Sequence, residues 1–146
     1  MPTNAPAHVI PVRVYYEDTD AGGVVYYANY LRYFERARTE MLRACGIQQD
    51  RWLTESRIGF VVRHIETDYR ASARLDDELT VTATIEKLGG ASVDFAQRAL
   101  RGDTVLATAR VRVACVDFAR HRPTPIPAPI VAALSAYVAA DATSSP

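Results

Sequence analysis

One long amphipathic segment, followed by shorter alternating ones, most constrains the fold of this 146-residue chain. Between residues 28 and 45, apolar side chains recur every three or four positions, which is the period of an α-helix with one buried face. These side chains are Tyr30, Phe34, Ala37, Met41 and Ala44. Gly46 follows directly, and glycine commonly ends a helix. The buried face of this helix requires an apolar surface to cover it.

The other regular segments alternate apolar and polar residues, the period of a half-buried strand. Residues 79–87 show it best, with Val81, Ala83 and Ile85 on one face and threonines on the other. Further strands are expected at residues 9–17, 57–69, 92–100 and 104–116. In the first of these one face carries Val12, Val14 and Tyr16, and in the last one face carries Val105, Ala107, Ala109, Val111, Val113 and Cys115.

The links between these strands are as short as turns, which favours antiparallel neighbours. We therefore predict an α+β fold in which a five-stranded antiparallel sheet packs on the long helix. Short helices are expected at residues 49–55 and 130–138, the second after an extended, proline-rich connector at 122–129. We expect one domain over residues 1–146, with flexible ends at 1–8 and 139–146.

Charge and cysteine content exclude several classes of protein. Seventeen basic residues balance seventeen acidic ones, which argues against a dedicated nucleic-acid binder. No apolar run reaches the roughly 18 residues of a membrane span. Cys45 and Cys115 lie far apart without metal-binding spacing, and the N-terminus has no signal-peptide pattern. We expect a reduced, cytoplasmic protein without a metal site or disulfide, and with both cysteines in the core.

The loop before the long helix is the most informative stretch. Glu17, Asp18 and Asp20 lie within four residues, and two glycines follow. No Ser or Thr directly precedes the helix and Asn29 is the nearest candidate cap, so its first N–H groups are expected to be free for a ligand. They would polarise an acyl carbonyl, which a carboxylate attacks directly or through water. A purely structural alternative also fits, because acids near a helix start stabilise it by about 0.3–1 kcal/mol.

A family resemblance favours the first interpretation. The run over residues 12–43, with Asp-Thr-Asp-Ala-Gly-Gly-Val-Val-Tyr at 18–26, resembles the Tol-Pal-associated acyl-CoA thioesterases, the YbgC-like family. These belong with the 4-hydroxybenzoyl-CoA thioesterases among hotdog-fold proteins. Similarity continues through residues 60–63, 73–77 and 115–117. It implies a hotdog fold and a thioesterase that acts on acyl-CoA or acyl carrier protein. It also implies a homodimer or homotetramer with sites between subunits, and no cofactor beyond the coenzyme A of the substrate.

The resemblance also implies residue roles. Asp20 would be the catalytic carboxylate, and the backbone N–H of Tyr27 would bind the thioester oxygen. The Tol-Pal branch usually has His at position 27, so tyrosine keeps the backbone role and removes any imidazole. Expected substrate-binding residues are Gly23, Tyr26, Asn29, Arg63, Ser92, Arg120 and Arg122.

A second departure concerns coenzyme A. Residues 88–91 are Leu-Gly-Gly-Ala, where relatives often carry Arg or Lys. The Gly-Gly turn still offers backbone N–H groups to phosphate, and basic help would come from Arg120, Arg122 and Arg63. Two other functions stay open: hydration of an enoyl thioester, which normally requires a histidine that the motif at 18–30 lacks, and non-catalytic binding of acyl-CoA or a carrier protein.

Other motif residues are expected to have structural roles. Tyr26, Tyr27, Tyr30 and Tyr33 are expected mostly in the core or at a subunit contact, with Tyr26 also able to line an acyl pocket. Residues 76–77, both aspartate, are expected to cap a turn into the next strand.

Overall fold

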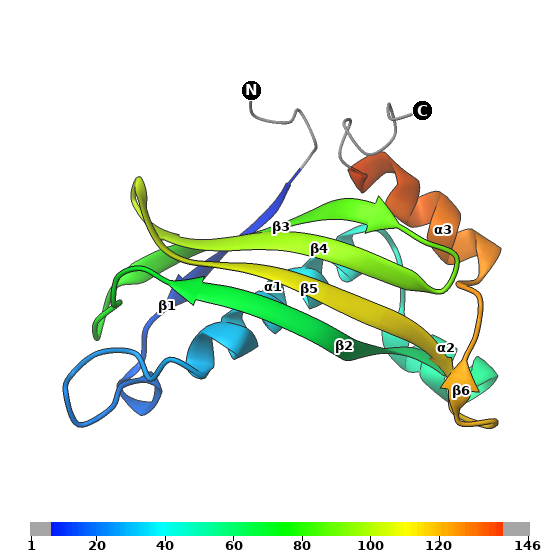
Figure 1. Cartoon of the computed structure of the whole chain (residues 1–146), viewed down its shortest axis with the longest axis horizontal. Coiled ribbons are helices and arrows are strands. Elements are labelled where there is room, and N and C mark those ends of the chain that lie inside the picture. Colours follow the sequence, from blue (N-terminus) through cyan, green and yellow to red (C-terminus); the bar gives the residue numbers. More distant parts are fainter. Residues whose placement is uncertain (1–6, 139–146) are drawn as a thin grey trace.

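A curved antiparallel sheet packs against one long helix in this computed structural model, which describes residues 7–138 (Figure 1). The strands are β1 (His8–Arg13), β2 (Ile58–Tyr69), β3 (Glu78–Leu88), β4 (Ser92–Arg101), β5 (Thr104–Asp117) and the two-residue β6 (Arg122–Pro123). The helices are α1 (Asn29–Ala44), α2 (Gln49–Ser56) and α3 (Ala128–Leu134), with 3-10 turns η1 (Tyr16–Asp18) and η2 (Ser135–Tyr137). The α+β class and the five-stranded antiparallel sheet are confirmed, with β6 as a short addition.

The strands lie in the order β1-β3-β4-β5-β2, and β6 pairs with β5. Each neighbouring pair is antiparallel. This order makes β1 and β2 the two edges of the sheet. In Figure 1, α1 lies behind the sheet, while α2, α3 and β6 gather at one end of it. The expected flexible ends fall mostly on residues 1–6 and 139–146, which lie outside the described residues, whereas His8 begins β1 and pairs with Ala83.

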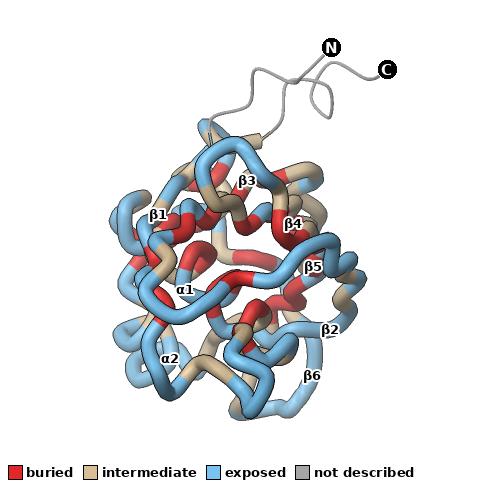
Figure 2. The backbone as a smooth tube through the Cα atoms, turned by 90° about the vertical axis from the view of Figure 1, so that its left-hand side faces the viewer, coloured by how far each residue is buried: buried red, intermediate tan, exposed pale blue. Residues whose placement is uncertain are grey.

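The core lies between α1 and the face of the sheet turned toward it (Figure 2). Phe34, Ala37 and Met41 of α1 are fully buried, and so are the alternating Val81, Ala83 and Ile85 of β3, as predicted. Ala44 is exposed, against the prediction. The buried stripe continues from Met41 and Leu42 to the half-buried Cys45 instead, and Ala44 is the last residue of α1. Gly46, with φ +83°, ends the helix as predicted.

β1 is shorter than predicted, because a local turn replaces its second half. The backbone N–H of Tyr15 donates to the Asp18 carboxylate at 2.9 Å, and the N–H of Asp18 returns to the Tyr15 carbonyl at 2.9 Å. Such local bonds compete with strand pairing. Val12 and Val14 are buried as expected, but Tyr16 lies in η1 and is exposed, so its assignment to the buried face of a strand is wrong.

An irregularity in β5 changes which residues face the core. Ala99 pairs with Ala107, but Leu100 pairs with Val105, which leaves Leu106 as an extra residue. Leu106 is fully buried and Val105 is only half-buried, so the predicted burial of Val105 is wrong. A β-bulge shifts the alternation of side chains in this way.

The C-terminal part also differs in its boundaries. The connector predicted as extended through residue 129 includes β6 and ends where α3 begins, with Pro127 as its N-cap. Pro129, which was expected in the extended connector, lies in the first turn of α3, where proline needs no N–H partner. Cys115 is buried and Cys45 half-buried, and both are free thiols. Within residues 7–138, no helix has both the length and the apolar character needed to cross a membrane.

Candidate functional site

The loop between η1 and α1 is a tight turn at the end of the molecule. The N–H of Asp20 donates to the Val24 carbonyl at 2.9 Å, and the N–H of Gly23 donates to the Asp20 carbonyl at 3.0 Å. Gly23 has φ +81°, a conformation that side chains disfavour, and a Cβ added to it would meet no atom within 4 Å. Gly23 therefore shapes the turn and leaves open space beside it.

The side chain of Asp20 is exposed at the tip of this turn. Its Oδ1 accepts the N–H of Gly22 at 2.8 Å, which fixes the carboxylate against its own backbone. A Cβ on residue 22 would lie 3.2 Å from that oxygen, so glycine permits the close approach. Within residues 7–138, the second carboxylate oxygen, Oδ2, accepts no hydrogen bond.

The start of α1 holds a fixed turn with two uncommitted N–H groups. The N–H of Tyr26 donates to the Asp18 carbonyl at 2.9 Å, and the Tyr26 carbonyl accepts the N–H of Asn29 at 2.8 Å. The first bond fixes the peptide unit before Tyr26, and the second fixes the unit between Tyr26 and Tyr27, which carries the N–H of Tyr27. Within residues 7–138, the N–H groups of Tyr27 and Ala28 donate to no backbone carbonyl.

The prediction that the first N–H groups of the helix are free for a ligand holds for two of them only. The N–H groups of Asn29, Tyr30 and residue 31 are already bonded to the carbonyls three residues before them, so only those of Tyr27 and Ala28 remain. Asn29 does not cap the helix either. It is the first residue of α1, and its side-chain Nδ2 donates back to the Asp18 carbonyl at 2.9 Å.

Tyrosine rings connect this turn to the core. Tyr26 and Tyr27 are both exposed, contrary to a core role within one chain. The Tyr27 ring packs edge-on against Tyr69, the last residue of β2, with centroids 5.8 Å apart. Tyr69 in turn lies 5.6 Å from the buried ring of Tyr30. The candidate site is therefore anchored at the Tyr69 end of β2.

The other predicted substrate-binding residues lie elsewhere. Arg63 is exposed at an irregularity in the middle of β2, between Val62 and His64. Arg122 pairs with Asp117, which pairs with Ile58 at the first residue of β2. The twelve residues of β2 span about 36 Å at about 3.3 Å per residue. One chain therefore does not bring Arg122 to Asp20.

Arg120 and Ser92 share that distant end. Arg120 lies in the turn between β5 and β6, where the Asp117 carboxylate accepts its N–H at 3.2 Å and lies 3.9 Å from its guanidinium. Ser92 begins β4 and its carbonyl accepts the N–H of Gly89 at 2.8 Å. Within the described residues, the N–H of Gly90 donates to no backbone carbonyl, so the Gly-Gly turn retains one of its two expected donors.

A support behind the site was missed at the level of sequence. The phenolic oxygen of Tyr30 accepts the N–H of Ala73 at 3.0 Å, and the Ala73 carbonyl accepts the N–H of Val25 at 2.9 Å. Asp77 caps this segment, as predicted, by accepting the N–H of Arg74 at 2.9 Å. It also pairs with Arg101 at 2.9 Å. Local sequence patterns do not predict these contacts, because they join residues far apart in the chain.

Hydrogen bonding lowers the pKa of Asp77. The largest cause is the backbone N–H of Arg74, and the Arg101 guanidinium adds to it. Both groups stabilise the ionised carboxylate. The ionised carboxylate thereby stabilises the segment behind the candidate site.

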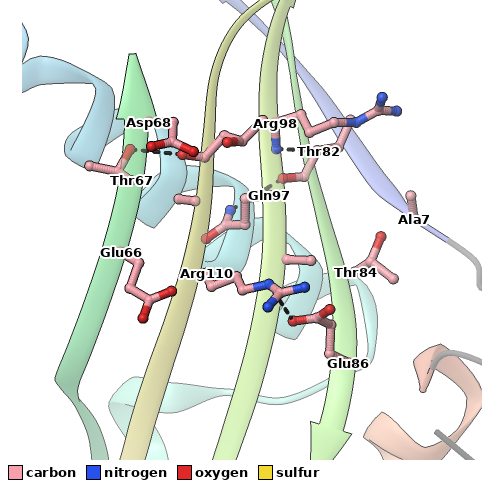
Figure 3. Close-up of a pocket in the computed structure, with 13 residues that line it drawn as sticks. Ala7, Glu66, Thr67, Asp68, Thr82, Thr84, Glu86, Gln97, Arg98 and Arg110 are labelled. Carbon is pink, nitrogen blue, oxygen red and sulfur yellow. Dashed lines mark hydrogen bonds and ion pairs between the residues drawn. The ribbon is translucent and has the colours of Figure 1, made fainter. Parts of the chain in front are cut away.

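A cavity of about 670 Å³ lies on the face of the sheet turned away from α1 (Figure 3). Thr82 and Thr84 line it, and Arg110 lies 3.4 Å from Glu86 across it. Neither Asp20 nor Tyr27 borders this cavity. It belongs to the polar outer surface and is separate from the candidate site.

Comparison with known proteins identifies the family. Residues 14–134 match the model of the thioesterase-like superfamily. The chain is 49% identical over 123 residues to an acyl-CoA thioesterase, YbgC, of Haemophilus influenzae, covering 84% of this chain and 90% of that protein. A probable thioesterase from Bartonella henselae superposes with a TM-score of 0.79 at 37% identity, covering 84% of this chain and all of that one.

A 1,4-dihydroxy-2-naphthoyl-CoA thioesterase from Synechocystis shares the fold. Its TM-score is 0.83 at 22% identity, and the match covers 89% of this chain and 96% of that one. The helix wrapped by an antiparallel sheet is thus the hotdog fold that the resemblance implied. The chain belongs to the YbgC-like acyl-CoA thioesterases of the thioesterase-like superfamily.

Proposed function

We propose that this protein hydrolyses the thioester bond of acyl-CoA at the turn before α1. The observation that carries the proposal is the uncommitted N–H of Tyr27, held on a fixed peptide plane at the start of a 16-residue helix. A donor fixed before the reaction stabilises the oxyanion that develops on the thioester oxygen. The positive end of the helix dipole acts in the same direction.

Asp20 supplies the second half of the chemistry. In one route its carboxylate attacks the acyl carbon, expels the coenzyme A thiolate and leaves a mixed anhydride that water hydrolyses. In the other route it takes a proton from the water that attacks. A single turnover in ¹⁸O-labelled water separates the two routes, because only the anhydride route places label in the Asp20 carboxylate.

We infer that the complete site lies between two copies of the chain. Arg120 and Arg122 are expected to bind phosphates of coenzyme A, yet they lie at the opposite end of β2 from Asp20. Within the described residues, β2 pairs on one side only, with β5, and its Val62 is 52% exposed. An unpaired strand edge favours pairing with another chain. Antiparallel pairing of two β2 strands would carry Arg122 of one copy toward Asp20 of the other.

The edges of the sheet offer a matched test of this assembly. Val62→Glu places a charge on β2, and Val9→Glu places one on β1, where Val9 is also 52% exposed. We expect wild type to be a homodimer or a homotetramer by size exclusion with light scattering. Val62→Glu should yield monomers with little activity, while Val9→Glu should remain assembled and active. A wild-type monomer with full activity would contradict the shared site.

The chemical proposal is tested by release of free thiol from short, long and aromatic acyl-CoA thioesters. Asp20→Asn should lower kcat by about 10²–10⁴-fold, the usual contribution of a positioned acid or base. Asp103→Asn, at the exposed turn between β4 and β5, is the matched control and should retain activity. Wild-type activity in Asp20→Asn would remove Asp20 from the mechanism. No thiol release by wild type, with coenzyme A still bound, would favour a non-catalytic binding protein.

The cellular setting completes the proposal. We place the protein in the cytoplasm, which two free thiols support. Acyl carrier protein is a second candidate carrier of the acyl group, and it can be offered in the same thiol-release assay. A link to the Tol-Pal envelope system rests on the family resemblance alone. Co-purification of Tol-Pal components with the tagged protein is its test.

A further inference from the structure

Tyr30 connects the helix that starts at the candidate site to the segment behind it. Its side chain is buried, and its phenolic oxygen accepts the N–H of Ala73 at 3.0 Å. Its own backbone N–H donates to the carbonyl of Tyr27 at 3.3 Å. Tyr30 therefore binds the carbonyl of Tyr27 through its backbone and the N–H of Ala73 through its side chain.

The Ala73 peptide passes this connection on to the turn. Its carbonyl accepts the N–H of Val25 at 2.9 Å, and the neighbouring Val24 forms a bridge with Arg74. Ala73 is fully buried, so water cannot replace the phenolic oxygen as acceptor for its N–H. Loss of that acceptor would loosen residue 73, whose carbonyl binds the N–H of Val25, two residues before Tyr27.

Arg101 and Asp77 hold the segment of residues 72–77 on the side away from Tyr30. Arg101 donates to the carbonyl of Ser72 at 3.1 Å and to the carboxylate of Asp77 at 2.9 Å. Asp77 in turn accepts the N–H of Arg74. The segment therefore provides a stable support, and Tyr30 fixes the start of α1 to it.

We propose that Tyr30 is a positioning residue for thioester hydrolysis, holding the Tyr27 N–H in place through Ala73 and Val25. This inference rests on the proposed oxyanion role of Tyr27. Tyr30 touches neither the thioester nor Asp20 in this role. It acts because an oxyanion donor is effective only where it is fixed before the reaction.

A neighbouring tyrosine provides the matched control. Tyr33 lies one turn further along α1, is equally buried, and packs its ring 6.0 Å from that of Tyr30. Its hydroxyl forms no hydrogen bond of good geometry among the described residues, and burial together with the nearby Asp18 carboxylate raises its pKa. Tyr30→Phe and Tyr33→Phe therefore each remove one buried hydroxyl from the same helix, and only the first removes the acceptor of the Ala73 N–H.

The experiment compares both variants with wild type on an active acyl-CoA. We expect Tyr30→Phe to lower kcat by about tenfold or more with KM within about twofold, the pattern of an interaction made in the transition state. Tyr33→Phe should keep kcat. Amide hydrogen exchange should show faster exchange at Val25 in Tyr30→Phe only. Ile130→Val, a core truncation in α3 at the other end of the molecule, shows what lowered stability alone does to kcat.

The outcomes separate this inference from the proposal on which it rests. Full kcat in Tyr30→Phe, or an equal loss in Tyr33→Phe or Ile130→Val, would overturn the positioning role. If Asp20→Asn is inactive in the same assay, the proposed function survives that result. If Asp20→Asn keeps wild-type activity, the proposed function fails first.

Discussion

A buried pair, Arg38 on α1 and Gln97 on β4, provides the sharpest stability prediction. Arg38 is only 8% exposed, and its Nη1 donates to Oε1 of Gln97 at 2.9 Å. The amide of Gln97, also buried, donates to the Phe34 carbonyl at 2.9 Å. Burial lowers the pKa of Arg38, as expected for a cation withdrawn from water. The guanidinium thus depends on Gln97 for a hydrogen bond that solvent does not supply.

We predict that Gln97→Leu lowers the free energy of unfolding by about 2–4 kcal/mol. A hydrogen bond to a charged group contributes about 1.5–3 kcal/mol, and a buried polar group left without its partner costs about 1–3 kcal/mol, more when it is charged. Adding Arg38→Met removes the buried guanidinium that has lost its acceptor. The double variant should then recover to within about 1 kcal/mol of wild type, because apolar pairs replace buried polar ones at little cost.

Equilibrium unfolding in urea measures these differences, at one fixed protein concentration because association adds to apparent stability. Gln97→Leu, Arg38→Met alone, the double variant and wild type form a double-mutant cycle, which isolates the energy of the pair. The reasoning is refuted if Gln97→Leu stays within about 0.5 kcal/mol of wild type. It is equally refuted if the double variant is no more stable than Gln97→Leu alone.

Three further predictions follow from single contacts. Because the folded state lowers the pKa of Asp77, its carboxylate stabilises the protein above the ordinary aspartate pKa of about 4, and that stability is lost as pH falls through the lower folded value. The urea midpoints of Asp77→Asn and wild type should therefore differ at neutral pH and converge in acid, and a gap independent of pH would contradict this. Gly23→Ala forces a side chain at φ +81° and should cost about 1 kcal/mol in urea unfolding, whereas Gly90→Ala, which meets no atom within 4 Å, should cost less. Gly59→Ala brings a Cβ to 2.9 Å from the Phe118 ring and should lower stability by about 1–3 kcal/mol, so an unchanged Tm would show that the ring moves freely.

Most elements of this fold could be predicted from periodicity, because helix and strand patterns are local. The helix start and stop were predicted to within a residue, and β3 alternates as expected. The errors occur where another contact overrides the local pattern. The carboxylate of Asp18 ends β1 early, and the extra residue Leu106 reverses the alternation at the start of β5.

The candidate site divides in the same way. Asp20, Gly23 and Tyr27 are near neighbours in the chain, so the sequence alone determined that they share one turn at a helix start. The bond from Tyr30 to Ala73 joins residues 43 positions apart, and no local pattern encodes it. The register of β2 on β5, which sends Arg120 and Arg122 to the opposite end from Asp20, was likewise decided only by the tertiary structure. Periodicity specifies which face of a segment is buried, but strand order and register follow from how all the faces pack together.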